Sequence, residues 1–263
     1  MSEVPLLLSI AGAVATITLN RPSAGNTIDL PLAQALVQAA IRCDNDPALR
    51  CVVLTGAGKL FCGGGDLASF AAAGEQVSAF LSELAGTLHM AVSRLMRMNK
   101  PLLVLVNGPA AGAGLSLALA GDIVLAARSA HFTAAYGAVG LTPDGGMSWL
   151  LPRLVGMRKA QEMILTNVRV GADEGERIGL VTRAVDDTAL ADEGARQAAL
   201  LAASATGAIG RARALLLESY GGSFEGHLER ETRSIAASGG TDECREGVGA
   251  FLARRKPDFQ GVS

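Results

Sequence analysis

The chain has 263 residues, of which 49% are hydrophobic and 18% charged, and its formal net charge is -2. A chain of this length buries a large core and forms one large domain or a domain with a subdomain. The small net charge and the lack of any run of like charges argue against a protein that binds a nucleic-acid backbone.

The first two thirds of the chain alternate between β-rich runs and helical patterns. Residues 6–20 predict two strands around a turn at Ala11-Gly12, and residues 31–41 carry apolar side chains at helical spacing. The β-rich run "CVVLTGAG" follows, then a helix near 76–98. A further run at 101–107 leads into a helix near 115–121, and residues 122–135 lead through "TPDGG" into another. This alternation predicts an α/β fold in which loops at strand ends carry the ligand site.

Residues 101–127 form the most apolar long stretch, which raises the question of a membrane span. Asn107, Pro109 and Asp122 interrupt it, and its glycines would leave backbone groups without hydrogen-bond partners in lipid. We therefore expect no membrane-spanning helix.

The last third of the chain changes character. From about residue 189, alanine-rich helical segments follow one another without β-rich runs. We therefore divide the chain into a core of residues 1–188 and a C-terminal helical subdomain of residues 189–263. No low-complexity linker separates them, so we expect the two parts to pack together.

Cysteine and histidine usage bears on the compartment and on metal binding. The four cysteines form no CxxC pair, which predicts reduced thiols in a cytoplasmic protein. The three histidines, His89, His131 and His227, fall at no spacing typical of metal ligands, so we expect no metal site.

Two glycine-rich loops follow β-rich runs, "FCGGGDL" at 61–67 and "NGPAAGAGL" at 107–115. Glycine lets a ligand approach the backbone closely, and N–H groups at the start of a helix favour an oxyanion. Neither loop has the spacing of a Walker loop or a dinucleotide site. For either loop alone, a purely conformational use of glycine in a tight turn remains open.

Five segments, taken in order, closely resemble the crotonase superfamily, the enoyl-CoA hydratase/isomerase family, over nearly the whole chain. The resemblance implies a spiral of repeated ββα turns with a C-terminal helical part that forms a homotrimer or a dimer of trimers. It implies an acyl-CoA thioester as substrate, with no cofactor besides the coenzyme A of the substrate. The segments are "LNRPSAGN", "FCGGGDL", "KPLLVLVNGPAAGAGLSLALAGDIVLAARSAHF", "GLTPDGGMSWLLPRLVG" and "DECREGVGAFLARRKPDF".

The resemblance also assigns roles within the two loops. It places the two oxyanion-hole N–H groups, which would polarise the thioester carbonyl, on Gly63 and Ala113. Asp66 also suits the cap of the following helix, and residues 69–84 are expected to line the acyl pocket. The neighbouring residues assigned to substrate binding are Gly64, Gly65, Asp66, Leu67, Gly112 and Gly114.

The acid/base residues depart from the pattern of the hydratases in this family. The positions of the two hydratase glutamates hold Ser116 and Tyr136, whose hydroxyls are poor bases at neutral pH. Asp144 remains, at a position where the resemblance places the carboxylate of Δ3,Δ2-enoyl-CoA isomerases. One carboxylate can take a proton from C2 and return it at C4. From the residues alone, Asp144 also suits a helix N-cap.

His89 leaves other reactions open. The resemblance places the histidine base of 4-chlorobenzoyl-CoA dehalogenases here, with the nucleophilic carboxylate at Asp144. The paucity of aromatic residues, one Trp and two Tyr, argues against a benzoyl pocket. Our leading hypothesis is an isomerase that uses Asp144. The alternatives are a hydratase with an atypical base, a dehalogenase or thioester hydrolase, and a non-catalytic acyl-CoA-binding protein.

Overall fold

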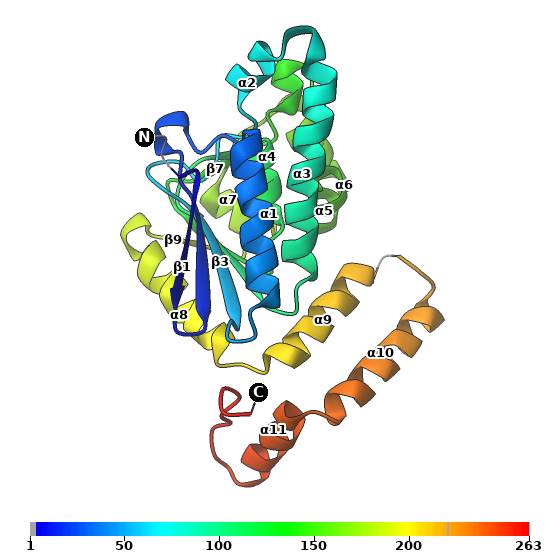
Figure 1. Cartoon of the computed structure of the whole chain (residues 1–263). Helices are drawn as coiled ribbons and strands as arrows, with labels where there is room; N and C mark the ends of the chain where they lie inside the picture. The colour runs from blue at the N-terminus through cyan, green and yellow to red at the C-terminus, as the bar shows by residue number, and fades with distance from the viewer. Residues whose placement is uncertain (1–3, 220, 263) are drawn as a thin grey trace.

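The computed structural model describes residues 4–219 and 221–262 (Figure 1). Its main sheet has six strands in the order β1-β2-β3-β4-β6-β9. β1 and β2 form an antiparallel hairpin, and each further strand lies parallel to its neighbour. The bounds are β1 Leu6–Ala11, β2 Val14–Leu19, β3 Cys51–Gly56, β4 Leu102–Val106, β6 Ile123–Ala127 and β9 Arg183–Val185.

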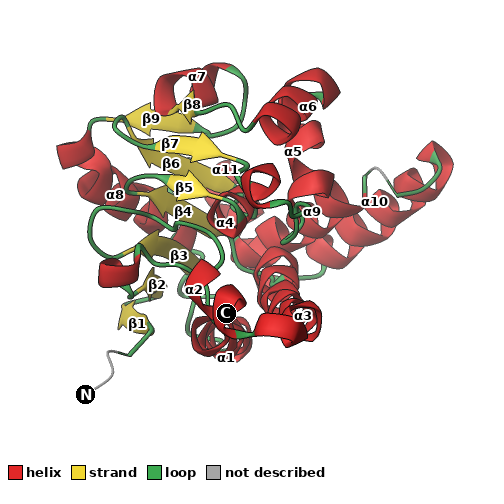
Figure 2. Cartoon of the chain, turned by 90° about the horizontal axis from the view of Figure 1, so that it is seen from above, coloured by secondary structure: helices red, strands yellow, loops and turns green. Residues whose placement is uncertain are grey.

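The main sheet is covered on both faces. Helices α1 (Leu30–Asn45) and α3 (Val77–Arg97) pack together on one side, and α8 (Leu190–Ala202) lies across β3, β4 and β6 on the other (Figure 2). The uninterrupted apolar runs of β3 and β4 suit parallel strands buried on both faces. The predicted α/β fold is confirmed, with the strand and helix order expected from the sequence.

A second sheet and several short helices stand at one end of the main sheet. This sheet joins β5 (Ala110–Ala111), β7 (His131–Thr133) and β8 (Val170–Gly171). A single β-bridge from Cys62 to Ala110 ties the loop after β3 to it, and another joins Gly65 of that loop to Ile28. The helices around this sheet are α2 (Leu67–Ala72), α4 (Ala113–Leu119), α5 (Met147–Val155), α6 (Met157–Thr166) and α7 (Ala172–Arg177).

The C-terminal helices leave the sheet region after α8. Helix α9 (Thr206–Glu218) is attached by buried Arg213, which donates to the carbonyl of Leu95 and pairs with Asp122. Helix α9 leads away from the core, α10 (Phe224–Gly239) runs back beside it, and α11 (Asp242–Leu252) follows at the end of α10 (Figure 1). The division placed at residue 189 falls before α8, although α8 packs on the sheet. The projecting part of the chain therefore begins with α9.

The same helices bear on the question of a membrane span. Within residues 4–219 and 221–262, no single helix is long and apolar enough to cross a membrane. One pair of segments, 187–202 and 206–218, passes that test together by length and composition, but it bends by 100°.

Candidate active site

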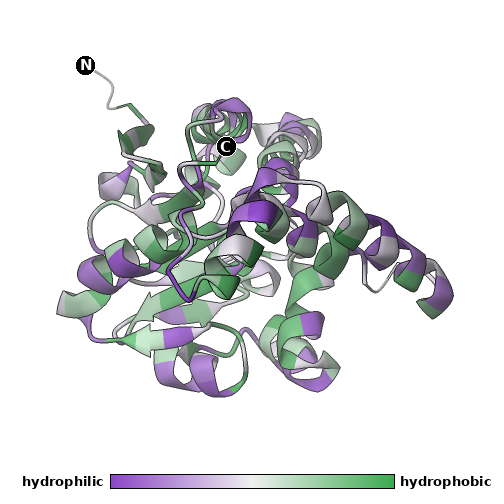
Figure 3. Cartoon of the chain, turned by 90° about the horizontal axis from the view of Figure 1, so that it is seen from below, coloured by the Kyte–Doolittle hydropathy of each residue, from purple (hydrophilic) through white to green (hydrophobic). Residues whose placement is uncertain are grey.

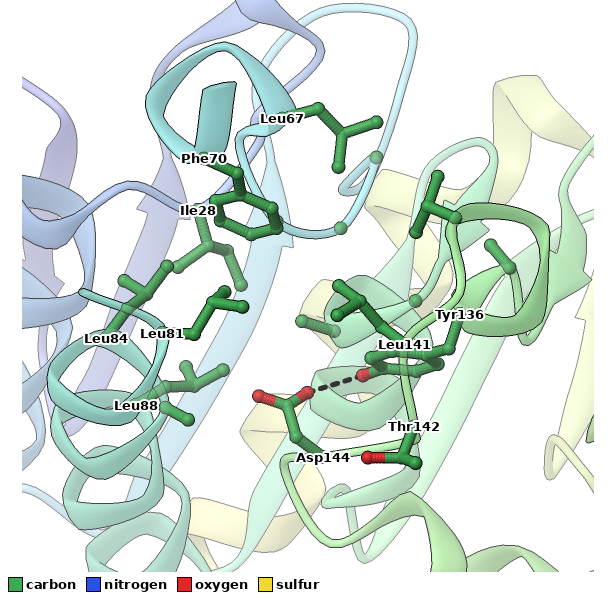
Figure 4. A pocket seen from close by; sticks show the side chains of 18 of the residues that line it. Ile28, Leu67, Phe70, Leu81, Leu84, Leu88, Tyr136, Leu141, Thr142 and Asp144 are labelled. Atoms are coloured by element: carbon green, nitrogen blue, oxygen red, sulfur yellow. Dashed lines mark hydrogen bonds between the residues drawn. The ribbon is translucent and has the colours of Figure 1, made fainter. Parts of the chain in front are cut away.

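A cavity of about 390 Å³ lies between α3, the two glycine-rich loops and the segment after β7 (Figure 4). Its walls are mostly apolar, and Figure 4 shows one carboxylate, that of Asp144, among the labelled side chains. The expectation that residues 69–84 line a pocket is met by Phe70, Leu81 and Leu84. The other labelled lining residues are Ile28, Leu67, Leu88, Tyr136, Leu141 and Thr142.

Close packing between the two loops explains several of their glycines. A Cβ on Gly108 would lie 2.0 Å from the carbonyl oxygen of Lys59, and one on Gly114 would lie 2.2 Å from that of Cys62. Gly64 has a φ of +101°, which side chains rarely adopt, and a Cβ there would lie 2.9 Å from the oxygen of Ala111. The two backbones are therefore in contact, so the conformational use of glycine accounts for part of the motif.

Hydrogen bonding within the loops changes one of the predicted oxyanion donors. The Gly63 N–H donates to the carbonyl of Gly25 at 2.9 Å, so it is not available to a ligand, and its assignment is corrected. The Gly64 carbonyl accepts the Ile28 N–H at 2.7 Å. Because the C=O and N–H of one peptide point in opposite directions, this bond turns the Gly65 N–H away from Ile28. Among the described residues of these loops that line the cavity, the N–H groups of Gly64, Gly65 and Ala113 have no partner.

The residues assigned to substrate binding divide into two groups. Asp66 accepts the N–H groups of Ala68 and Ser69 at the start of α2 and binds Arg21 at 2.9 Å, which is the capping role expected for it. It holds the loop and does not line the cavity, and Gly114 is likewise used in packing. The remaining assigned residues, Gly64, Gly65, Leu67 and Gly112, line the cavity.

Asp144 forms a polar cluster with Ser116 and Tyr136. The Tyr136 hydroxyl donates to Oδ1 of Asp144 at 2.5 Å, and the Ser116 hydroxyl donates to its main-chain oxygen at 2.8 Å. Helix α5 has Gly146 as its N-cap and no side-chain cap, so the capping alternative for the Asp144 carboxylate is excluded. Gly145 has a φ of +59°, and a Cβ there would lie 2.7 Å from that of Ser116.

Tyr136 is set to donate a hydrogen bond and not to act as a base. It stands in a short 3-10 helix, Tyr136–Val139. Burial, and then the negative charge of the neighbouring Asp144 carboxylate, raises the pKa of its phenol. The phenol therefore keeps its proton at neutral pH.

Comparison with known proteins places this site in a family. A family model described as enoyl-CoA hydratase/isomerase matches residues 9–262. The chain belongs to the enoyl-CoA hydratase/isomerase family. As a member of it, the chain is an enzyme that acts on CoA thioesters, and its crotonase fold is confirmed.

Three relatives illustrate the range of reactions in the enoyl-CoA hydratase/isomerase family. The 1,2-epoxyphenylacetyl-CoA isomerase of Escherichia coli is 36% identical, covering 97% of this chain and 98% of its own. A 4-chlorobenzoyl coenzyme A dehalogenase of an Arthrobacter species is 32% identical, covering 92% and 88%. The crystal structure of an enoyl-CoA hydratase from a Polaromonas species superposes with a TM-score of 0.92 at 32% identity, covering 96% and 98%. Membership alone therefore does not determine the reaction.

His89 lies beside the Asp144 carboxylate but outside the cavity that Asp144 lines. Its Nε2 accepts the Gly145 N–H at 3.0 Å and lies 4.0 Å from Oδ2 of Asp144. The ring is half exposed and lines a second hollow of about 510 Å³ between α3, α5 and α9. Nε2, the ring nitrogen that lies 4.0 Å from the carboxylate, thus already accepts a hydrogen bond from a backbone N–H.

Metal binding finds no support in the part of the chain that the structure describes. There, no three His, Cys, Asp or Glu side chains come together in a group that could hold a metal ion.

Proposed function

We propose that this enzyme moves a double bond of an enoyl-CoA from C3 to C2, with Asp144 as its acid/base group. The proposal is carried by the position of one carboxylate in an apolar cavity that the unpaired N–H groups of Gly65 and Ala113 also border. Among the described lining residues, Asp144 is the one acid. The apolar walls favour an uncharged hydrocarbon acyl group.

The proposed chemistry divides the work between backbone and side chain. The N–H groups of Gly65 and Ala113 hold the thioester oxygen and stabilise the negative charge that develops there. The Asp144 carboxylate removes a proton from C2, and the electron pair moves onto that oxygen. The electron pair on the oxygen then re-forms the C=O bond, the double bond moves to C2=C3, and C4 takes the proton from Asp144. The product is the 2-enoyl thioester. Coenzyme A belongs to the substrate, so the reaction needs no separate cofactor.

Hydration requires more than these residues supply. A hydratase must activate a water molecule and also protonate the substrate, work that two carboxylates share in the hydratases. Here the two corresponding positions form hydroxyl hydrogen bonds around Asp144, and Tyr136 keeps its proton. This arrangement supports isomerisation over hydration by an atypical base.

The direct test supplies the purified protein with a 3-enoyl-CoA and follows the ultraviolet absorbance of the conjugated 2-enoyl product. A parallel assay supplies a 2-enoyl-CoA and follows loss of that absorbance on hydration. We expect isomerisation to exceed hydration by at least about a hundredfold, because hydration needs two acid/base groups and the described cavity lining holds one acid. Binding of both thioesters without turnover would favour the non-catalytic acyl-CoA-binding alternative.

A dehalogenase or thioester hydrolase is the second candidate, favoured by the 4.0 Å approach of His89 to Asp144. In that reaction Asp144 attacks the substrate and His89 activates water. In the isomerase, His89 only accepts the Gly145 N–H, so His89→Ala is expected to lower isomerisation by less than about tenfold. Turnover of 4-chlorobenzoyl-CoA that disappears in His89→Ala would instead establish the second candidate.

We also propose that the enzyme assembles as a trimer or a dimer of trimers through its C-terminal helices. Helix α10 has no buried residue, and Phe224 and Ile235 are 71% and 74% exposed. On α11, Phe251 is 83% exposed. Figure 3 shows apolar stretches alternating with polar ones along these helices. Exposed apolar side chains at helical spacing on a projecting arm indicate a contact surface for further copies.

A further inference from the structure

The two residues at the hydratase glutamate positions both contact the remaining acid. Ser116 comes from α4 and Tyr136 from the segment after β7, and their hydroxyl oxygens lie 3.2 Å apart. Tyr136 contacts the side chain of Asp144, whereas Ser116 contacts its main chain. Tyr136 therefore fixes the carboxylate of Asp144, whereas Ser116 contacts only its backbone.

A count of hydrogens shows how this cluster is bonded. Two hydroxyl hydrogens serve four contacts, because the Ser116 hydroxyl oxygen also lies 3.5 Å from the carbonyl oxygen of Gly112. The Tyr136 hydrogen goes to Oδ1 of Asp144, because that contact is the shorter, at 2.5 Å, and its acceptor is charged. The Ser116 hydrogen goes to the Asp144 main-chain oxygen at 2.8 Å. The contact between the two hydroxyls is left without a hydrogen.

The two carboxylate oxygens of Asp144 are consequently unequal. Oδ1 is held by the phenol, while the other oxygen points into the cavity beside Leu88 (Figure 4). His89 Nε2 lies 4.0 Å from Oδ2, beyond hydrogen-bond distance, and is bonded to Gly145. Oδ2 is the oxygen free to meet a substrate.

We propose that Tyr136 is a positioning residue that leaves Asp144 one working oxygen, so that Oδ2 both removes the proton from C2 and delivers it to C4. This inference rests on the proposed isomerase function. The C2–H bond breaks, its electron pair enters the dienolate, and Oδ2 carries the proton as a carboxylic acid. A C4–H bond then forms on the same face, the C2=C3 double bond appears, and the carboxylate is restored. Atoms and charge balance without a co-reactant.

Fixing the carboxylate has a measurable consequence. A carboxylate tied at Oδ1 does not rotate during the short life of the dienolate, and the apolar walls limit access of water to the carried proton. The hydrogen taken from C2 is then delivered to C4 before it exchanges. Without the phenol hydroxyl, the carboxylic acid can rotate and exchange its hydrogen with solvent.

The experiment supplies a 3-enoyl-CoA with deuterium at C2 in ordinary water and measures deuterium at C4 of the product by mass spectrometry and NMR. We expect most wild-type turnovers to transfer the label. In Tyr136→Phe, which removes only the hydroxyl, we expect the transferred fraction to fall severalfold and kcat by about tenfold, with KM changed less than about twofold. Ser116→Ala is the matched control. It removes a hydroxyl from the same cluster but keeps the Tyr136–Asp144 bond, so label transfer should stay at the wild-type level.

Two results would overturn the role of Tyr136 while leaving the isomerase intact. One is a wild-type product that carries only solvent hydrogen at C4, a measurement that needs no variant. The other is Tyr136→Phe protein that folds and transfers the label as the wild type does. A wild-type protein that does not isomerise, or Asp144→Asn protein that still does, would overturn the proposed function and the role of Tyr136 with it.

Discussion

Replacement of Asp144 by asparagine is expected to lower kcat/KM for isomerisation by about 10²–10⁴-fold, the range of a lost general acid/base group. Asparagine has nearly the same shape but cannot take the C2 proton. Its amide oxygen can still accept the Tyr136 hydroxyl, and the Ser116 bond to the main chain remains. The fold and the affinity for a CoA thioester should therefore be nearly unchanged. Progress curves of 2-enoyl absorbance, together with thioester binding by calorimetry, give both quantities.

Asp66→Asn is the matched control for that substitution. Asp66 is a second carboxylate beside the cavity loops, but it caps α2 and binds Arg21. Its replacement should lower the melting temperature and leave kcat within about tenfold of the wild type. Asp144→Asn protein that binds thioester and turns it over at the wild-type rate would show that another group performs the chemistry.

Substitution of Ile235 by aspartate is expected to change the mass of the particle from several chains to one. Phe224, Leu228 and Ile235 are four and seven residues apart, which places them on one face of α10. This face is exposed, and contacts of α10 within the chain are with α9 and α11. A carboxylate at its centre would have to be buried without a partner in an interface between copies. Light scattering on the eluate of a sizing column measures the mass directly.

Ala237→Asp provides the comparison for Ile235→Asp. Ala237 is exposed on the same helix, two residues along and therefore close to the opposite face. The wild type and Ala237→Asp should share one mass, and only Ile235→Asp should dissociate. A wild-type protein of one chain's mass would contradict assembly through this face.

The elements of the fold were predictable because each follows from a local pattern. The turn at Gly12 joins β1 and β2 as expected, and the apolar runs of β3 and β4 are central strands. The place of α8 was not predictable from composition. Its alanines resemble those of the later helices, but Gly194 allows it to lie against Leu105 in the sheet, where a Cβ would come within 2.5 Å. That contact joins residues far apart in the sequence.

The residues of the candidate site were predictable from the sequence, but the hydrogen-bond partners of their individual atoms were less so. The family resemblance led to Asp144, and the structure places it in the cavity with Ser116 and Tyr136. The Gly63 N–H is paired because it donates to the carbonyl of Gly25, and the Ile28 N–H binds the Gly64 carbonyl. Both bonds involve residues outside the loop, so nothing in the sequence "FCGGGDL" itself indicates that Gly65 rather than Gly63 has the unpaired N–H. The bond from Gly145 to His89 is equally a product of the fold.

The close packing of the two glycine-rich loops determines which positions of this enzyme can be substituted. A side chain at Gly108 or Gly114 would collide with rigid backbone, so the packing that holds the two loops together tolerates almost no substitution at these glycines. Positions 116, 136 and 144 act through side chains that project from that frame. Substitutions at these three positions can thus change the chemistry of the cavity while the backbone of the two loops keeps its shape. Substitutions at Gly108 and Gly114 should accordingly lower the stability of the fold, whereas substitutions at Tyr136 and Asp144 should change the reaction and leave the fold intact.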